Sequence, residues 1–504
     1  MAKLKSINPS NGKELGSVSI ATKLKVEEAV DRAQKAFSIW REVPLEKKQK
    51  MMIKLAGLLK KNTKKLGELI TLEMGKPLAE AVAEVAYDEE LVLYLASEAV
   101  NVLRDEVIDT KLSRAELNKI NKQKIEDSVD YLIKKNIKVC SVIRYDPVGV
   151  VAAIKPWNFP VDSVLLSVVP ALMAGNCVVL KPSDNVPLVA NELAKLIWKA
   201  GVPKEVFQVV HGRAQVGAML VDCNVNMVSF TGSSEVGREI AEKCSKRFIK
   251  YSLEMGGSSP VIVCRDADLD LAVNGVLWGR FNNCGQVCNA VKRVLVVNSV
   301  AQAFTKKLAK RIEELKVGDP MDKETNVGPL VSDKQLKALQ SQVTRGVIQG
   351  ARIIVGGRRM REDEYIKGCY HEPTLMINVT PKNEVMQEEV FGPVLPICTV
   401  DTFERAIKFA NQSKYGLTAS VFTKSKINAK KALCELQAGS VYVNDVSVIP
   451  LEAPWCGVKE SGFGVGGGRH GIWEYVHKKH MHVNLDKAKI RDGWYKESKV
   501  VLAD

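Results

Sequence analysis

The pattern of apolar and polar positions divides the chain into a helical N-terminal part and two stretches in which strands and helices alternate. Between residues 24 and 105, apolar residues recur every three or four positions, as in VEEAVDRAQKAFSIW, which predicts amphipathic helices. From residue 148 onward, short apolar runs such as VGVVAAI and NCVVL are separated by helical patterns. Strands that alternate with helices are typical of parallel sheets covered by helices. We therefore expect an α/β fold.

The same alternation resumes after residue 255. SPVIVC, KRVLVVNS and GSVYVND are predicted strands, and DLDLAVNGVLWGRF is a predicted helix. AQAFTKKLAKRIEELKV is predicted to be a helix that ends just before Gly318. The two stretches share no sequence repeat, so we expect two parallel-sheet α/β domains that follow each other along the chain.

A highly charged segment over residues 101–146 interrupts this order. Residues 111–140 are predicted to be helical, because Ser113 and Glu116 suit a capping box. The same segment carries a loose apolar stripe of Leu117, Ile120, Ile125, Val129 and Leu132. We interpret it as a surface helix or a contact between subunits, with a nucleic-acid-binding arm as the less favoured alternative. Near the C-terminus, KHMHVNL predicts an edge strand followed by a charged extension.

Composition agrees with a large globular protein. The chain has 504 residues, 46% hydrophobic and 26% charged, and contains no apolar run long enough to span a membrane and no apolar signal segment at its start. The net charge is +15, but the lysines are spread along the chain and no nucleic-acid-binding motif is visible. The eleven cysteines fit no disulfide framework. These features predict a cytoplasmic protein with neither a nucleic-acid nor a membrane partner.

Three segments are candidates for phosphate or ribose binding. Gly462–Gly467 matches G-x-G-x-x-G, but it follows a polar segment rather than a strand, so we interpret it as a turn. FTGSSEVGR places Ser233 at the start of a predicted helix, where backbone N–H groups favour a phosphate, although an ordinary N-cap explains it equally well. KPSD follows a predicted parallel strand, where Lys181 and Asp184 could meet a ribose or phosphate.

Two cysteines, Cys284 and Cys288, stand four residues apart in FNNCGQVCNA. No histidine lies near them, so a metal site is disfavoured, and the spacing is not the C-x-x-C of a redox pair. Glycine and amide side chains around Cys288 favour a loop that exposes one thiol. A nucleophilic thiol also needs a base and an oxyanion site, for which Glu254 in LEMGGSSP and Asn158 in PWNFP are candidates.

Seven segments together resemble the signature segments of the aldehyde dehydrogenase superfamily. They are PWNFP, LKPSD, FTGSSEVGR, LEMGGSSP, FNNCGQVCNAVKR, EEVFGPV and GVKESGFG, in that family's order and at about its spacing. The resemblance covers residues from about 6 to about 485. It implies a Rossmann-like NAD(P)-binding domain (residues 1–110 and 147–256), a catalytic domain (257–465) and oligomerisation or insertion elements (111–146 and 478–504).

The resemblance also implies roles for individual residues. Cys288 would be the nucleophile, Glu254 the general base and Asn158 the oxyanion donor, with Cys284 a bystander. Cofactor contacts are implied for Trp157, Lys181, Ser183, Asp184, Gly232, Ser233, Val236, Gly237, Glu389 and Phe391. Substrate contacts are implied for Ser163, Leu166, Val287, Ile449 and Trp455. No metal is implied.

The implied activity is NAD(P)-dependent oxidation of an aldehyde to a carboxylic acid through a thiohemiacetal and a thioester on Cys288. Asp184 would repel a 2′-phosphate and favour NAD, with NADP as an alternative. The substrate is predicted to be a small aliphatic aldehyde or semialdehyde, and the assembly a homodimer or homotetramer. Relatives that bind succinate semialdehyde often carry an arginine where Leu166 stands. The alternatives are a CoA-acylating enzyme, against which Glu254 argues, and a succinate semialdehyde-specific enzyme.

Overall fold

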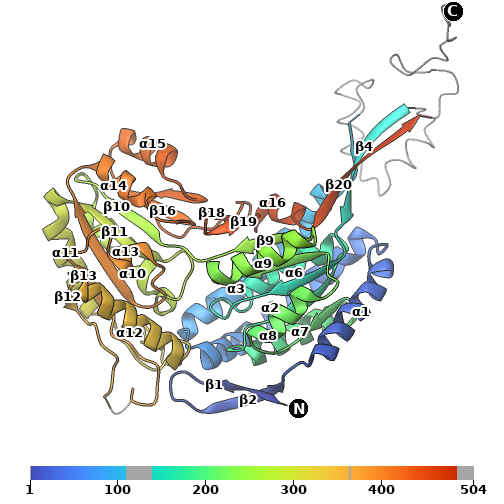
Figure 1. Ribbon diagram of the computed structural model, residues 1–504, viewed down its shortest axis with the longest axis horizontal. Helices are drawn as coiled ribbons and strands as arrows, with labels where there is room; N and C mark the ends of the chain where they lie inside the picture. The colour runs from blue at the N-terminus through green and yellow to red at the C-terminus, as the bar shows by residue number, and fades with distance from the viewer. Residues whose placement is uncertain (1, 109–138, 363–364, 485–504) are drawn as a thin grey trace, which may run out of the picture.

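The computed structural model describes residues 2–108, 139–362 and 365–484, and over these residues it confirms the α/β fold. Two large sheets lie on opposite sides of the molecule (Figure 1). Each sheet has its own buried apolar core, one built mainly from residues 26–253 and the other from residues 261–446. These cores agree with two α/β units, while the residue limits given above for the domains stay a prediction.

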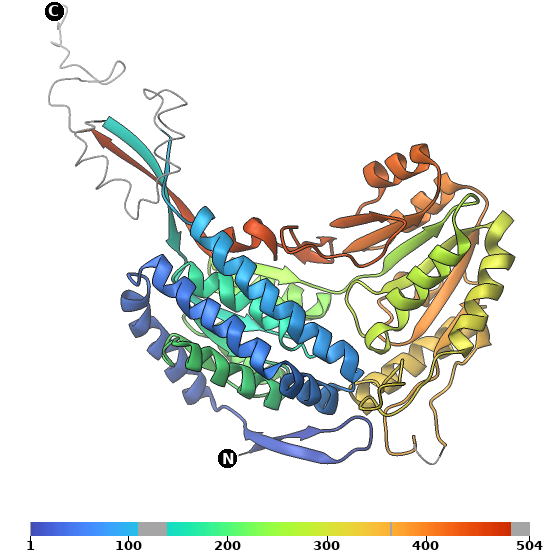
Figure 2. The same cartoon turned by 180° about the vertical axis from the view of Figure 1, so that it is seen from behind.

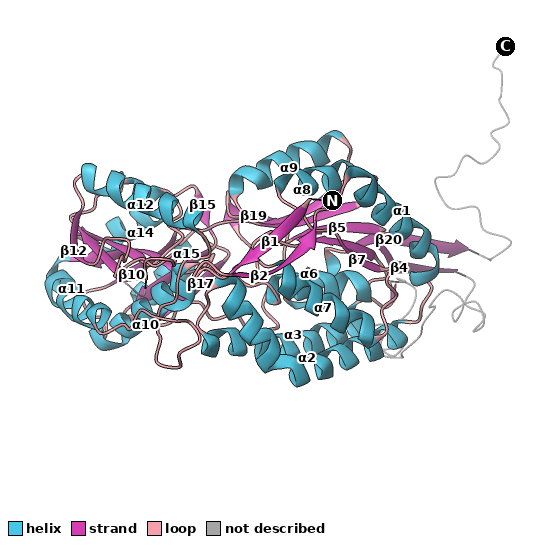
Figure 3. Cartoon of the chain, turned by 90° about the horizontal axis from the view of Figure 1, so that it is seen from below, coloured by secondary structure: helices cyan, strands magenta, loops and turns pink. Residues whose placement is uncertain are grey.

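The first large sheet contains six strands, parallel except for one short edge strand. In spatial order they are β19 (Gly462–Phe463), β9 (Lys250–Glu254), β8 (Met227–Thr231), β5 (Val150–Ile154), β6 (Cys177–Lys181) and β7 (Phe207–Val209). All five residues of β5, VVAAI, are buried, as expected where helices cover both faces of a sheet. Those helices are α1 (Lys23–Trp40), α8 (Ala214–Asp222) and α9 (Ser234–Lys246) on one face, and α6 (Asp162–Met173) and α7 (Pro187–Ala200) on the other (Figure 3).

Two long helices, α2 (Leu45–Met74) and α3 (Leu78–Val102), pack against each other outside α6 and α7. Figure 2, which views the molecule from behind, shows both helices in blue in front of this half. Helix α2 ends at Gly75, whose φ of 83° is in the left-handed region that glycine favours. A Cβ there would lie 2.6 Å from the ring of Pro329, so this turn also requires a glycine for close packing.

The second large sheet contains seven strands, parallel except for its first edge strand. In spatial order they are β12 (Arg352–Val355), β13 (Thr374–Ile377), β14 (Val394–Val400), β11 (Val291–Val297), β10 (Ser259–Val263), β16 (Thr418–Phe422) and β17 (Ser440–Val443). The longer helices of this half are α10 (Leu269–Phe281), α11 (Asn298–Glu313), α12 (Asp333–Ile348), α14 (Phe403–Asn411) and α15 (Lys426–Glu435).

A third sheet projects away from the rest of the molecule (Figure 1). It pairs β20 (Val476–Asn484) with β4 (Val139–Pro147), and β4 with the short β3 (Glu106–Val107), all antiparallel. The edge strand predicted near the C-terminus is therefore confirmed. The helix predicted over residues 111–140 is wrong at its end, because Val139 and the residue after it already belong to β4. The rest of that helix lies outside the described residues.

Several other predicted elements differ from the structure. The helix expected to end just before Gly318 ends at Glu313, and the N–H of Gly318 instead bonds to the carbonyl of Val327. Helices α8, α12 and α15 were not predicted. Helix α15 buries only Ala432, so it carries almost no apolar periodicity. The N-terminal hairpin of β1 (Lys3–Ile7) and β2 (Glu14–Ser19) was also missed, since its alternation is short.

Candidate active site

The carboxyl ends of four parallel strands gather the predicted motifs at one edge of the first sheet. The strand register places Ile154 beside both Lys181 and Phe230, and Thr231 beside Glu254. The segments KPWNFP, KPSD, TGSS and EMGG therefore begin at the same edge. Ligands of open α/β sheets bind at this edge, outside the carboxyl ends of the strands.

A cavity of about 840 Å³ lies between this edge and the second half of the molecule. Its wall contains all three candidate catalytic residues: Asn158, Glu254 and Cys288. It also contains every predicted substrate residue: Ser163, Leu166, Val287, Ile449 and Trp455. Five of the predicted cofactor residues line it too: Trp157, Gly232, Ser233, Glu389 and Phe391. Residues far apart in the sequence are thus brought together in one concave site.

Cys288 lies in the turn between a short 3-10 helix (Asn282–Gly285) and β11. It lines the cavity, whereas Cys284 is completely buried in the core of the second half. Burial, and then the negative charge of Glu389, raise the pKa of the Cys288 thiol to about 12, while Lys292 opposes this shift. The resting thiol is therefore protonated, and it needs a proton acceptor before it can attack a substrate.

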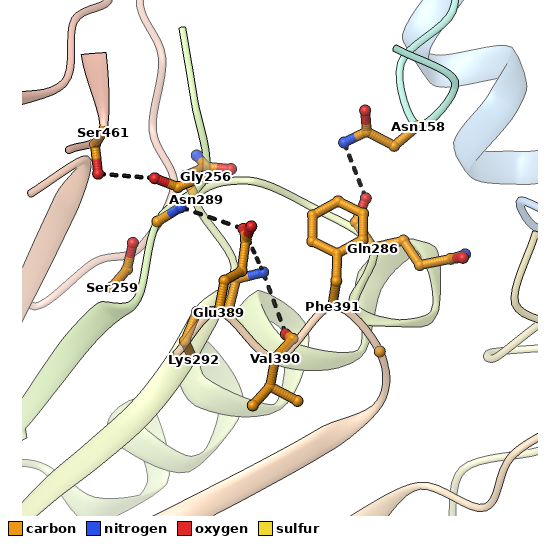
Figure 4. Close-up of polar contacts among 12 residues, drawn as sticks. Asn158, Gly256, Ser259, Gln286, Asn289, Lys292, Glu389, Val390, Phe391 and Ser461 are labelled. Carbon is orange, nitrogen blue, oxygen red and sulfur yellow. Dashed lines mark hydrogen bonds and ion pairs between the residues drawn. The ribbon is translucent and has the colours of Figure 1, made fainter. Parts of the chain in front are cut away.

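Asn158 connects the PWNFP loop to the cysteine loop. Its buried side-chain Nδ2 donates to the carbonyl of Gln286 at 3.0 Å (Figure 4). In return, Nδ2 of Asn283 donates to the backbone carbonyl of Asn158 at 3.1 Å. An amide NH2 group has two donors, and the bond to Gln286 uses one of them. The second N–H of Asn158 is therefore held close to the cysteine loop as a potential donor to a ligand.

Glu254 is the last residue of β9, and its carboxylate is held by groups from three segments. Burial raises its pKa to about 7, while the charge of Lys155 and a hydrogen bond from Trp455 oppose the shift. Burial lowers the pKa of Lys155 to about 8, and its Nζ donates to Ser229 Oγ at 3.0 Å. A Cβ on Gly466 would lie 2.2 Å from Oε1 of Glu254. Glu254 is therefore a carboxylate that can take up a proton near neutral pH.

The glycine-rich segment 462–467 serves this site and does not form a dinucleotide loop. Its first two residues pair with β9 as strand β19, and Trp455 and Gly466 exchange two backbone hydrogen bonds, of 2.6 and 2.7 Å. The segment thus forms part of the wall around Glu254.

Glu389, Phe391 and Trp157 form the part of the cavity that suits a flat ring and a ribose. Glu389 accepts from the N–H of Gly257 at 3.2 Å and lies 3.4 Å from Nζ of Lys292 (Figure 4). Phe391 meets Trp157 edge to face, with ring centroids 5.6 Å apart. This combination of an anionic acceptor and aromatic faces beside Cys288 fits the nicotinamide half of a dinucleotide.

The other five cofactor candidates lie outside the cavity, along the same sheet edge and in the first turn of α9, which begins next to the cavity-lining Ser233. Ser233 is the N-cap of α9 and accepts from the N–H of Val236 at 3.4 Å. A Cβ on Gly237 would lie 2.2 Å from Sδ of Met255, so this turn approaches its neighbour closely. Lys181 ends β6, and burial lowers its pKa while Asp184 opposes the shift. Ser183 lies in the loop between Lys181 and Asp184. A helix N-terminus and a buried ammonium along one edge of the sheet fit a pyrophosphate and a ribose.

Two further features bear on the chemistry of the described part of the chain. No group of three histidine, cysteine, aspartate or glutamate side chains is arranged to hold a metal ion among the described residues. None of the described helices is long and apolar enough to cross a membrane.

Comparisons with known proteins identify the family. The model of the aldehyde dehydrogenase family matches residues 2–481. The mitochondrial succinate-semialdehyde dehydrogenase of Arabidopsis thaliana is 36% identical over 95% of this chain and 85% of its own length. The NADP(+) succinate-semialdehyde dehydrogenase of Escherichia coli (strain K12) is 34% identical over 95% and 94%. A point mutant of Staphylococcus aureus betaine aldehyde dehydrogenase, solved with NAD+ and a mercaptoethanol-modified cysteine, is 32% identical over 98% and 96%, with a TM-score of 0.90.

The chain therefore belongs to the aldehyde dehydrogenase family. The expected class, an oxidoreductase that oxidises an aldehyde with NAD(P), is confirmed.

Sequence reasoning missed several residues of the cavity wall, and also Lys155, which does not line the cavity but acts on Glu254. Lys155 could have been noticed as a lysine directly after the fully apolar run VVAAI. Four others, Glu80, Glu84, Tyr87 and Asp162, line the cavity from α3 and the start of α6. In the sequence, the three from α3 look like an ordinary polar helix face, because nothing local shows that this face is turned towards the site.

Proposed function

We propose that Cys288 is the nucleophile, Asn158 the oxyanion donor and Glu254 the general base of an aldehyde dehydrogenase that releases a carboxylic acid. The observation that carries this proposal is the bond from Asn158 to the Gln286 carbonyl, two residues before Cys288, in the cavity that Glu254 also lines. It supports a site in which the donor amide and the thiol act on one carbonyl group.

The proposed reaction begins when Cys288 loses its proton to Glu254 and its sulfur attacks the aldehyde carbon. The resulting oxyanion accepts hydrogen bonds from the Asn158 amide and from the backbone N–H of Cys288. A nicotinamide held beside Glu389 and Phe391 would supply the hydride acceptor for the former aldehyde carbon, which would leave a thioester on Cys288. Glu254 releases the proton of Cys288 to solvent and then takes a proton from water as the water attacks the thioester. The Cys288 thiolate leaves as the acid is released, and it regains a proton from Glu254.

We propose that NAD is preferred over NADP. The carboxylate of Asp184 stands close enough to Lys181 to affect its pKa, and it would repel a 2′-phosphate on the adenosine ribose. The measurement is kcat/KM for each cofactor at low ionic strength. Equal or better use of NADP would show that Asp184 does not face the 2′ position.

The test of the activity is nicotinamide reduction by the purified protein with short aliphatic, hydroxy and semialdehyde substrates. Cys288→Ala should abolish turnover, and the matched variant Cys284→Ala, in which the removed thiol is buried away from the cavity, should retain it. Turnover that survives in Cys288→Ala would refute the nucleophile assignment.

Transfer of the acyl group to coenzyme A is the second candidate outcome of the same thioester. Glu254 favours hydrolysis, because its raised pKa suits proton abstraction from water. Adding coenzyme A to the assay distinguishes the two outcomes. Reduction of the cofactor that strictly requires coenzyme A would overturn the hydrolytic mechanism.

We also propose that the protein assembles as a homodimer or homotetramer. Strand β20 supports this, because it lies at the edge of the projecting sheet and offers backbone groups to another strand. Light scattering coupled to size-exclusion chromatography would measure the mass in solution, and a monomer at micromolar concentration would contradict the proposal.

A further inference from the structure

The wall of the catalytic cavity is strongly acidic. Among its described lining residues, Lys76 is the one lysine, and there is no arginine. The carboxylates in the same wall are Glu80, Glu84, Asp162, Glu254 and Glu389. A charged group on a substrate therefore enters a cavity whose wall contains more carboxylates than cationic side chains.

Lys76 is not available to bind a substrate anion, because its ammonium is already held. Its Nζ lies 2.5 Å from Oε2 of Glu84, with both side chains almost completely buried, and 3.8 Å from the centre of the Phe159 ring. The other oxygen of Glu84 accepts from the backbone N–H of Val161 at 3.1 Å. Glu84 and Lys76 thus neutralise each other and fasten the start of α6.

Asp162, the first residue of α6, lines the cavity with no such partner. Next to it lies Asp88 of α3, which is fully buried and whose two oxygens have no hydrogen-bond partner of ordinary geometry in the described part of the chain. Burial, and then Asp162, raise the pKa of Asp88, and burial together with Glu84 raises that of Asp162 to about 7. Lys76 opposes both shifts only in part. Neighbouring carboxylates of this kind share one proton and keep one negative charge.

Asp162 lines the same cavity as Asn158, Glu254 and Cys288. The charge of Glu254 contributes to the raised pKa of Asp162, so the two carboxylates are within electrostatic reach of each other. On the other side, Tyr87 feels the charge of Asp162, and its hydroxyl donates to the carbonyl of Ile449 at 3.3 Å. Asp162, Tyr87 and Ile449 thus line the same cavity as Glu254, and we place the far end of a short substrate beside Asp162.

We infer that Asp162, backed by Asp88, binds a protonated amine at the far end of the substrate, so that the preferred substrate is a short ω-aminoaldehyde. This inference rests on the proposed function. A primary ammonium brings three N–H donors and a positive charge to a carboxylate whose hydrogen-bonding neighbour is another acid, Asp88, and whose nearest ammonium, Lys76, is paired with Glu84. A substrate carboxylate would meet like charge with no free cation, and an alkyl chain would leave the buried charge unpaired.

The experiment compares kcat/KM of the full-length enzyme for four aldehydes. Butanal and 3-aminopropanal have the same number of heavy atoms and differ by a methyl against an ammonium group. Succinate semialdehyde carries the opposite charge, and 3-trimethylammoniopropanal carries a cation without N–H donors. We expect 3-aminopropanal to exceed butanal and the trimethyl compound by about tenfold or more, as one charge-assisted hydrogen bond allows, with succinate semialdehyde the poorest of the four.

The variant Asp162→Asn keeps the shape of the side chain and removes its charge. We expect it to bring the ratio of kcat/KM for 3-aminopropanal over butanal close to one. Asp222→Asn is the matched control, since Asp222 is an exposed residue of α8 that pairs with Lys243 at 2.7 Å, and the ratio should not change there.

The wild-type ratios keep the inference falsifiable even if the variant fails to fold. Butanal oxidised as well as 3-aminopropanal would overturn the inference and leave the proposed function intact. A preference for the trimethyl compound would overturn the assignment to a primary amine, and a preference for succinate semialdehyde would overturn cation binding altogether. Failure of all four aldehydes in a folded protein would instead overturn the proposed function.

Discussion

Replacing Asn158 by alanine separates the proposed catalytic role of its amide from its contribution to stability. In the resting structure the side chain makes a hydrogen bond of 3.0 Å to the Gln286 carbonyl. Such a neutral bond contributes about 1 kcal/mol to the free energy of unfolding. The variant should therefore melt only a few °C below the wild type.

The catalytic loss should be much larger. If the second N–H of Asn158 meets the oxyanion, its removal costs about 10²–10³ in kcat, or roughly 3–4 kcal/mol of transition-state stabilisation. The backbone N–H of Cys288 would remain as a donor, so activity should fall steeply but stay measurable. The expected loss in catalysis exceeds the expected loss in stability by about 2 kcal/mol or more.

The assay is the rate of cofactor reduction at saturating aldehyde, together with a thermal melt of the same preparation. Asn298→Ala is the matched control, because Asn298 makes a bond of the same length, 3.0 Å, to Asp401 on the exposed surface. A threefold or smaller drop in kcat for Asn158→Ala, in a protein that melts normally, would refute the oxyanion role.

The other predictions concern the buried carboxylates. Glu254→Gln should slow both the first cofactor reduction, seen by stopped flow, and steady-state turnover, because the same carboxylate takes a proton from Cys288 and from water. Unchanged steady-state turnover would argue against the base. The wild-type rate should rise with pH around 7, where Glu254 loses its proton. Lys155→Met should move this rise to higher pH, because the variant lacks the cation that lowers the pKa of Glu254. A pH profile that does not move would contradict this role of Lys155. Glu73→Ala should lower the free energy of unfolding by about 2–5 kcal/mol in a denaturant titration, because the N–H groups of Leu188 and Val189 lose their acceptor; a loss below 1 kcal/mol would mean that water replaces it.

The fold could be predicted from the sequence wherever apolar runs are long or strictly periodic. β5 and β11 are buried along their whole length. β5 appears in the sequence as the continuous apolar stretch VVAAI, and β11 as the run VLVV that follows Lys292 and Arg293. Helix α15 and the N-terminal hairpin bury few residues, so their patterns are weak. The apolar positions of α12, Leu336, Leu339 and Val343, do follow helical spacing, so this helix was predictable from the sequence.

The site was predictable as far as its motifs are contiguous. PWNFP and the cysteine loop are short segments whose residue types indicate their chemistry. The fold brings these two segments together in one cavity. The partners of these motifs were not predictable, because they come from distant segments. The charge of Lys155 reaches Glu254 because the pairing of β5, β8 and β9 brings the ends of these strands together. Asp88 lies next to Asp162 because α3 packs on α6.

Of the five carboxylates in the cavity wall, three face a buried lysine and two, Glu80 and Asp162, do not. Glu80 accepts instead from the backbone N–H of Asn283 at 2.7 Å. The three pairs are Glu84 with Lys76, Glu254 with Lys155, and Glu389 with Lys292. A buried charge costs several kcal/mol unless it is paired, so each of these lysines stabilises a carboxylate that the site needs. Asp162 has another acid as its neighbour instead of a lysine. A protonated amine on the substrate would complete the fourth pair, and this would make substrate binding the step that neutralises the remaining charge of the site.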